Sequence, residues 1–88
     1  MTALHWAVDS GALEAAHWLL EKGASVDERD GEGSTALHYA CMCDRADLAS
    51  LLLSKGADAN VENLLAETPK ELANDSDLLK EVFERFAK

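Results

Sequence analysis

Basic residues are scarce in this sequence. Its 88 residues include 8 Lys and Arg against 17 Asp and Glu, which gives a formal net charge of −9 at pH 7. A chain this acidic repels phosphate groups, so nucleic acids and anionic membrane surfaces are poor candidates for its partner. Long apolar runs are also missing, since Leu51-Leu52-Leu53 is far shorter than the roughly 20 residues of a membrane-spanning helix. We therefore expect neither nucleic-acid binding nor direct membrane insertion.

Cysteine is scarce too. Cys41 and Cys43 are the two cysteines of the chain, too few for a disulfide framework, and free thiols fit a reducing compartment. On a helix they would point about 200° apart and could not share a metal ion, and no set of four zinc ligands is present. With no signal-peptide pattern after Met1, we predict an intracellular, cytoplasmic chain without metal or cofactor.

The composition is nevertheless that of a folded protein. The chain is 48% hydrophobic and 28% charged, which is too apolar for a disordered acidic tail. Its length supports one small domain, and we assign residues 1–88 to it.

An internal repeat is the most informative feature. Residues 2–7 (TALHWA) recur as 35–40 (TALHYA) and, degraded, as 68–73 (TPKELA), each 33 residues after the last. Residues 22–27 (KGASVD) recur with the same step as 55–60 (KGADAN). Two landmarks that share one period are typical of a solenoid of stacked units. The unit boundaries fall at about 1–33, 34–66 and 67–88.

Each unit is predicted to contain two helices and a loop. Thr35 can cap a first helix that runs to about Cys43, and Gly56 suits the end of the second. Residues 23–34 form a projecting loop with a tight turn. The second helix has an apolar stripe at three-to-four-residue spacing, made of Ala46, Leu48, Ala49, Leu52 and Leu53. We therefore predict an all-α solenoid of stacked helix-turn-helix units.

The third unit is predicted to be a degenerate C-terminal capping repeat after two full repeats. Ala66 stands where Gly33 stood, and Thr68 with Glu71 makes a capping box. Its outer face is more polar, as in terminal repeats. The apolar residues expected to hold the inward register of its last helix are Leu78, Leu79, Val82, Phe83 and Phe86.

The period, the Thr-Ala-Leu-His openings and the Lys-Gly-Ala helix ends resemble the ankyrin repeat over essentially the whole chain. The departures are Ala3 and Ala36 at the family's usual proline, and the missing His and Gly of the third unit. The resemblance implies a solenoid that contacts partner proteins through its inner helices and loop tips.

A narrower resemblance concerns residues 5–11 (HWAVDSG) and 38–45 (HYACMCDR). They are similar to the ankyrin tail of the large acyl-CoA-binding proteins, in which a separate upstream domain binds acyl-CoA and the ankyrin repeats contact partners. These residues do not supply that domain. One alternative is the ankyrin domain of an unrelated intracellular scaffold. Direct binding of acyl-CoA or another lipid is disfavoured, because CoA phosphates need converging cations and the eight here are spread singly.

The histidines have two interpretations. The rings of His5 and His38 are expected to bond a Thr hydroxyl and the loop backbone, which is a structural role. The alternative is a base–nucleophile pair of His38 and Cys41, three residues apart on one helix face. It lacks an orienting partner and a loop of oxyanion donors, so we predict that the chain is not an enzyme.

The large apolar residues outside the repeat pattern also have two interpretations. Trp18 aligns with Leu51 one unit later, so we expect it to pack between helices. Trp6 and Tyr39 are left open between packing and partner contact. The pair Leu64-Leu65 stands at a loop tip, where it is solvated unless the cap or a partner covers it.

Acidic residues crowd the loops, where Asp27, Glu28, Asp30 and Glu32 face only Arg29. They make either a solvated loop or a negative surface that steers a positively charged partner. We predict a non-catalytic interaction module that presents a concave, acidic surface to another protein. By the ankyrin resemblance, the partner-binding residues are Asp9, Ser10, Gly31, Glu32, Ser34, Met42, Cys43, Leu64, Leu65 and Glu67, with Trp6 and Tyr39 behind them.

Overall fold

The computed structural model describes residues 2–73 and 76–86. Both ends of the predicted domain, and residues 74–75 of its third unit, lie outside this described part. Within it, every regular element is a helix, which confirms the predicted all-α class. The helices are α1 (Ala3–Asp9), α2 (Leu13–Glu21), α3 (Ala36–Met42), α4 (Ala46–Ser54), α5 (Pro69–Leu72) and α6 (Asp77–Phe86).

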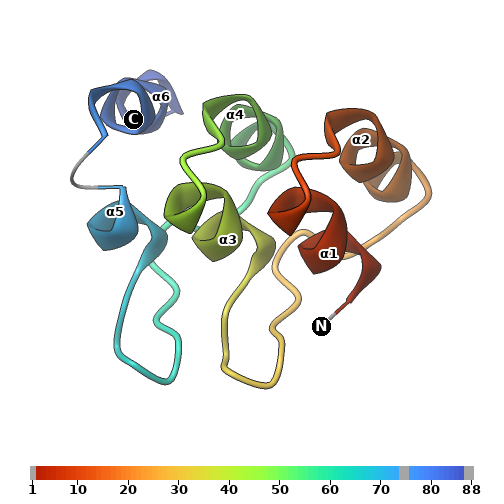
Figure 1. The fold of residues 1–88 in the computed structure, drawn as a ribbon, viewed down its shortest axis with the longest axis horizontal. Helices are drawn as coiled ribbons and strands as arrows, with labels where there is room; N and C mark the ends of the chain where they lie inside the picture. The colour runs from red at the N-terminus through yellow and green to blue at the C-terminus, as the bar shows by residue number, and fades with distance from the viewer. Residues whose placement is uncertain (1, 74–75, 87–88) are drawn as a thin grey trace.

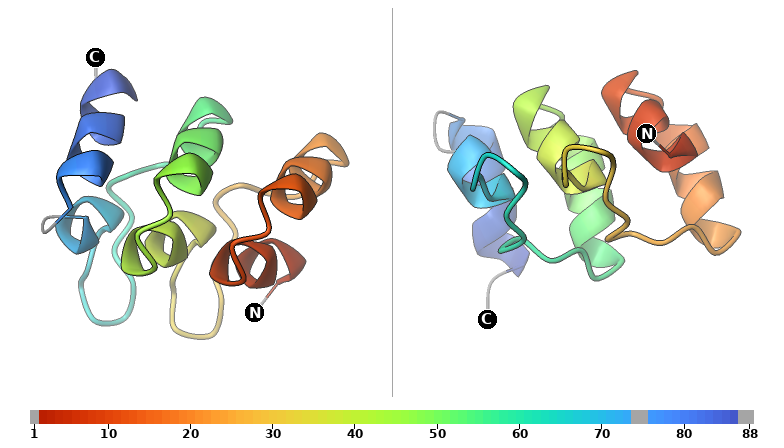
Figure 2. Two further views of the ribbon diagram at one scale, coloured as in Figure 1. Left: turned by 45° about the horizontal axis from the view of Figure 1, so that its top comes forward. Right: turned by 90° about the horizontal axis from the view of Figure 1, so that it is seen from below.

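The helices form two layers (Figure 1). In the inner layer α3 packs between α1 and α5, and in the outer layer α4 packs between α2 and α6. The loops from α2 to α3 and from α4 to α5 project beyond the inner layer and run alongside each other, as Figures 1 and 2 show. This arrangement is a solenoid in which each unit covers one side of the next.

A threonine at the same register begins each inner helix. Thr2, Thr35 and Thr68 are the N-cap residues of α1, α3 and α5. The Thr68 hydroxyl accepts a hydrogen bond from the Glu71 N–H, and the Glu71 carboxylate accepts one from the Thr68 N–H. The predicted capping box is therefore confirmed, and Pro69 follows at the first helical position, where its missing N–H costs nothing.

The core lies between the two layers. In α4 the predicted stripe is confirmed, since Leu48, Ala49 and Leu52 are buried and the other two members are partly buried. Stacking of small residues and leucines lets the helices of neighbouring units approach closely. The largest fully buried apolar side chains are Leu37, Leu48, Leu52, Leu79 and Val8.

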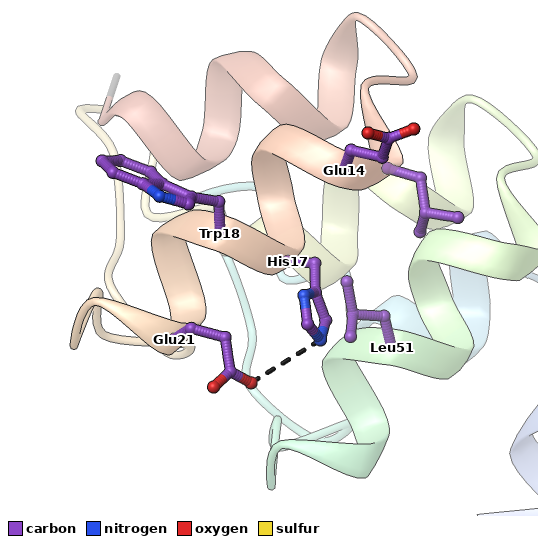
Figure 3. Close-up of a pocket in the computed structure, with 6 residues that line it drawn as sticks. Glu14, His17, Trp18, Glu21 and Leu51 are labelled. Atoms are coloured by element: carbon purple, nitrogen blue, oxygen red, sulfur yellow. Dashed lines mark ion pairs between the residues drawn. The ribbon is translucent and has the colours of Figure 1, made fainter.

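Two expectations about apolar side chains are wrong. Leu78 is 59% exposed, because it points about 100° away from the buried Leu79 on α6. Trp18 is also 59% exposed instead of packed between helices. Its counterpart Leu51 is partly covered because α2 of the preceding unit lies against α4. The Trp18 side chain instead points away from Leu51 (Figure 3).

Two buried histidines tie the loops to the inner helices. His5 Nε2 lies 2.8 Å from the Ser34 carbonyl oxygen, and His38 Nε2 lies 2.8 Å from that of Glu67. A carbonyl oxygen only accepts, so each ring carries its hydrogen on Nε2. Nδ1 then accepts from the N–H of Thr2 or Thr35. The structural role predicted for these histidines is confirmed.

We expect His38→Ala to destabilise the fold by about 1–3 kcal/mol from unsatisfied polar groups alone, because the Thr35 N–H and the Glu67 carbonyl lose a buried partner. Urea unfolding followed by circular dichroism measures this free energy. His17→Ala is the matched control, since His17 is exposed, and we expect it to change stability by less than about 0.5 kcal/mol. Equal effects of the two substitutions would contradict the structural role of His38.

The turn at Gly33 combines a left-handed backbone with a close approach to the next loop, so a side chain there is unfavourable. Its φ is +76°, and a Cβ there would lie 3.3 Å from the backbone nitrogen of Leu64. We expect Gly33→Ala to cost about 1–3 kcal/mol in unfolding free energy. Gly31→Ala is the control, because Gly31 has open space and no left-handed backbone. A Gly33→Ala protein as stable as the Gly31→Ala protein would show that the two loops do not approach in this way.

Candidate protein-docking site

A groove opens where the two projecting loops meet α3. Its volume is about 310 Å³. We call it the loop–helix groove, and its lining residues are Glu32, Ser34, Tyr39, Met42, Asn63, Leu64, Leu65 and Glu67. All but Asn63 belong to the predicted partner-binding set, so the fold gathers residues from all three predicted repeat units into one place.

The two loops that form the groove are bonded to each other. The Leu64 N–H donates to the Glu32 carbonyl oxygen over 2.9 Å. The Asn63 side-chain amide donates to the Ser34 hydroxyl over 3.3 Å. Ser34 itself is buried, and its carbonyl accepts from the His5 ring. These contacts fix the spacing between the loops, so the walls of the groove are set before any partner arrives.

Each loop tip is organised by one side chain at the same register. Asp30 Oδ1 accepts from the N–H groups of Glu32 and Ser34, at 2.9 and 3.0 Å. One period later, Asn63 Oδ1 accepts from the N–H groups of Leu65 and Glu67, both at 3.0 Å. Sequence reasoning did not include Asn63 among the site residues. The 33-residue step from Asp30 to a second carbonyl-bearing side chain is the signal that could have found it.

Tyr39 forms the floor of the groove and is mostly packed. It is 9% exposed, and its ring meets the His5 ring edge-on at 5.4 Å between centroids. Its hydroxyl donates to Asp30 Oδ2. That hydrogen bond, followed by burial and nearby acids, raises the pKa of Tyr39 to about 12. Trp6, at the same register in the first unit, is 63% exposed, so packing dominates only for Tyr39.

The carboxyl group of Asp30 feels opposing effects. Partial burial raises its pKa, but the hydrogen bonds from Tyr39 and from the N–H groups of Ser34 and Glu32 together lower the pKa below its ordinary value. Asp30 is therefore a carboxylate at neutral pH. It accepts hydrogen bonds both from the N–H groups of its own loop and from the Tyr39 hydroxyl.

Exposed apolar side chains form a ledge along the groove. Leu64 and Leu65 are 78% and 76% exposed, and Met42 is 51% exposed. The predicted cap does not cover the two leucines. Glu67 Oε1 accepts from the Asn63 amide at 3.1 Å. Within residues 2–73 and 76–86 the Glu32 carboxylate makes no hydrogen bond or ion pair, so it presents its charge to solvent at the edge of the ledge.

The other predicted partner-binding residues lie outside the groove. Cys43 Sγ donates to Asp9 Oδ1 over 3.7 Å, and the Ser10 hydroxyl donates to the Trp6 carbonyl oxygen over 2.8 Å. Gly31 is exposed at the loop tip. Asp9 and Ser10 stand at the end of α1, one unit away from the leucines. The structure therefore divides the predicted set into the groove and a flank beside it.

The alternative catalytic pair is not assembled. Cys41 is buried, and burial raises the pKa of its thiol to about 12, so it is not a thiolate at neutral pH. Both nitrogens of His38 are occupied by Thr35 and by the Glu67 carbonyl. Among the described residues, no cluster of three or more His, Cys, Asp or Glu side chains could hold a metal ion.

A second and larger groove lies on the outer layer, with a volume of about 520 Å³. Its lining residues are Leu13, Glu14, His17, Trp18, Glu21 and Leu51. Figure 3 shows His17 beside Leu51 and Trp18 directed away from both. Glu21 is bonded to Lys55 at 2.9 Å and lies 3.6 Å from His17, and the Lys55 hydrogen bond lowers the pKa of Glu21. The negative charge of Glu21 is therefore paired with Lys55, whereas Glu32 has no such partner among the described residues.

Tyr39 provides a direct test of the groove floor, because it is the one tyrosine of the chain. We expect its phenol to ionise with a pKa of about 12 when ultraviolet absorbance is followed against pH. Asp30→Asn removes the accepting carboxylate and should return the midpoint toward the ordinary 10.0. The amide keeps an oxygen for the two loop N–H groups, as Asn63 does. A wild-type midpoint near the ordinary value would contradict the Tyr39–Asp30 bond.

The same pair gives a pH dependence of stability. Because the pKa of folded Asp30 is lowered, its contribution is present above the ordinary carboxyl pKa and is lost as the pH falls through the folded pKa. We expect the free energy of unfolding of the wild type to exceed that of Asp30→Asn at neutral pH, and the gap to close in acid. Urea unfolding at both pH values measures it, and a gap independent of pH would rule out the charge as its origin.

A helix that could span a membrane is not found among the described residues. This finding agrees with the absence of a long apolar run in the sequence.

Comparison with known proteins identifies the family. A family model described as "Ankyrin repeats (3 copies)" matches residues 1–63. Human protein phosphatase 1 regulatory subunit 27 is 42% identical over 86 residues, which cover 98% of this chain and 54% of that protein. The ankyrin repeat and LEM domain-containing protein 1 homolog of Caenorhabditis elegans is 40% identical over 78 residues, covering 85% of this chain and 11% of that protein.

These relatives are longer than the chain, which spans about half of the first and a tenth of the second. Their names do not support a link to acyl-CoA-binding proteins, and that link stays a prediction. The family match indicates a protein–protein interaction module. Because this family model covers most of its length, the chain belongs to the ankyrin repeat family.

Proposed function

We propose that this chain is a non-catalytic interaction module that docks a partner protein in the loop–helix groove. The observation that carries the proposal is the apolar ledge of Leu64, Leu65 and Met42, exposed in a groove edged by Glu32 and Glu67. Contiguous apolar surface with a polar rim is typical of protein interfaces. A partner that covers the ledge would remove the two leucines from water.

The charge of the loops supports a basic partner surface. Asp27, Glu28 and Asp58 are exposed, and they belong to the same two loops that line the groove. Like charges spread along both loops attract a positively charged partner during its approach and repel an acidic one. The flank of Asp9 and Cys43 would extend the contact along the inner helices.

We further propose that residues 1–88 act as one domain of three units, at about 1–33, 34–66 and 67–88. The free thiols of Cys41 and Cys43 support a reducing, cytoplasmic setting. Two contexts follow from resemblance alone. One is the partner-docking part of a larger acyl-CoA-binding or transport protein, from residues 5–11 and 38–45. The other is phosphatase regulation, from the likeness to regulatory subunit 27.

The docking proposal is tested with a groove variant and a matched surface variant. The groove variant combines Glu32→Gln, Leu64→Ser and Leu65→Ser, and the control combines Leu78→Ser with Glu81→Gln on α6, where both residues are exposed. Proteins captured from a lysate by each immobilised chain are compared by mass spectrometry. We expect at least one partner to bind the wild type and the control but to be lost from the groove variant.

All three proteins should have the same circular dichroism, because the substituted side chains are exposed. If the groove variant captures every protein that the wild type captures, docking takes place at another surface. Calorimetry with the protein phosphatase 1 catalytic subunit tests the phosphatase context, and calorimetry with palmitoyl-CoA tests the alternative of direct acyl-CoA binding. Tight binding of palmitoyl-CoA by the 88 residues themselves would overturn the prediction that a separate domain is needed for it.

A further inference from the structure

We infer that the occupant of the loop–helix groove is an extended peptide segment in which an apolar side chain stands next to arginine or lysine. This inference rests on the proposed docking function and adds the chemistry of the partner. Three features of the groove lead to it: its size, the order of apolar and acidic groups along it, and its rigidity.

Size favours a short segment over a folded surface. The groove has a volume of about 310 Å³, at the lower end of the roughly 300–1,000 Å³ of ligand pockets. Its walls are two narrow loops that stand side by side (Figure 2). An extended chain can place successive side chains on opposite walls, because alternate residues of such a chain point in opposite directions.

The chemistry of the walls sets which side chains fit. Leu64, Leu65 and Met42 offer apolar surface that is still largely in water, so an apolar side chain laid on them buries surface on both partners. That burial contributes roughly 25 cal/mol for each Å² removed from water. The ledge therefore selects a leucine-like or aromatic residue as the anchor of the segment.

Acidic groups at the edge of the ledge select the neighbouring residue. Glu32 and Glu67 line the same groove from different loops. The Glu32 carboxylate makes no bond to the rest of the described chain, and the Asn63 amide bonds only one oxygen of Glu67 in that same part. A guanidinium group binds carboxylate oxygens in pairs and stays charged. Acidic and phosphorylated segments are excluded by the same charges.

The groove is rigid where the segment would lie. Asp30 and Asn63 each hold two backbone N–H groups of their loop, and the Leu64 N–H bonds the neighbouring loop. Binding to walls that are already fixed loses little conformational entropy on the protein side. This lets a short segment of few contacts bind measurably.

The test begins with a random peptide library displayed on phage and panned on the 88-residue chain. We expect the enriched sequences to carry leucine, methionine or an aromatic residue within one or two positions of arginine or lysine, and to lack Asp and Glu. Enrichment of acidic sequences, or of apolar sequences without a cation, would overturn the assigned chemistry. Failure of any sequence to be enriched would overturn the peptide class.

Affinities of an enriched peptide, measured by fluorescence anisotropy, then locate it. Leu64→Ser with Leu65→Ser should weaken binding about tenfold or more, as for a buried apolar anchor. Glu32→Gln with Glu67→Gln should weaken it about twofold to fivefold and reduce its dependence on salt. The glutamine at position 67 keeps an oxygen for Asn63. Leu78→Ser and Glu81→Gln, the controls on α6, should leave the affinity unchanged, and an equal loss in the controls would overturn the location.

A photo-crosslinking residue is placed at position 65 and, for comparison, at position 78. The two proteins distinguish a failure of docking in the groove from a failure of the extended-segment inference. Crosslinks to a cellular protein from position 65 alone, with no peptide enriched, would leave docking in the groove intact and overturn the extended-segment inference. Crosslinks from position 78 alone, or equally from both, would overturn both. A crosslink from 65 together with an enriched peptide that competes for it supports the segment as the occupant.

Discussion

Two buried histidine rings hold the projecting loops of this protein against its helices, and the docking surface depends on them. In each ring, one nitrogen is hydrogen-bonded to the threonine that begins the same helix. The other nitrogen is hydrogen-bonded to a carbonyl oxygen of the loop that leads into the next unit. Buried polar groups are almost always hydrogen-bonded, and here the hydrogen bonds also fix the position of each loop relative to its helix. The loop tips stand where they do because their bases are fixed to the rings of His5 and His38.

Rigidity of the loops explains how the chain keeps Leu64 and Leu65 in water. In a mobile loop such side chains would collapse onto the nearest apolar surface. Here the bonds of Asn63 to the backbone and to Ser34, with the Leu64 N–H bonded to Glu32, hold them outward. Acidic residues around them repel other copies of the chain, which opposes association through the exposed leucines. The exposure of the leucines and the negative charge around them therefore both come from residues of the same two loops.

Much of the fold could be predicted from the sequence. The 33-residue period placed the helices, the N-cap threonines and the Thr68–Glu71 capping box, because these depend on residues near in the chain. The roles of His5 and His38 followed from the same register. The candidate site was predicted less fully. The sequence indicated loop-tip residues but not Asn63, and it listed Asp9 and Ser10 with residues that the structure places one unit away.

Trp18 and Leu51 show where sequence reasoning ends. They occupy the same register in successive units, yet Trp18 is exposed and Leu51 is partly covered. Burial in a solenoid depends on which neighbouring unit packs against each side of a unit. The sequence by itself determined the period, the helices, the histidine bonds and the acidity of the loops. Only the tertiary structure decided that Glu32 of one loop and Leu64 and Leu65 of the next share a groove, because contacts between units join residues that no local pattern connects.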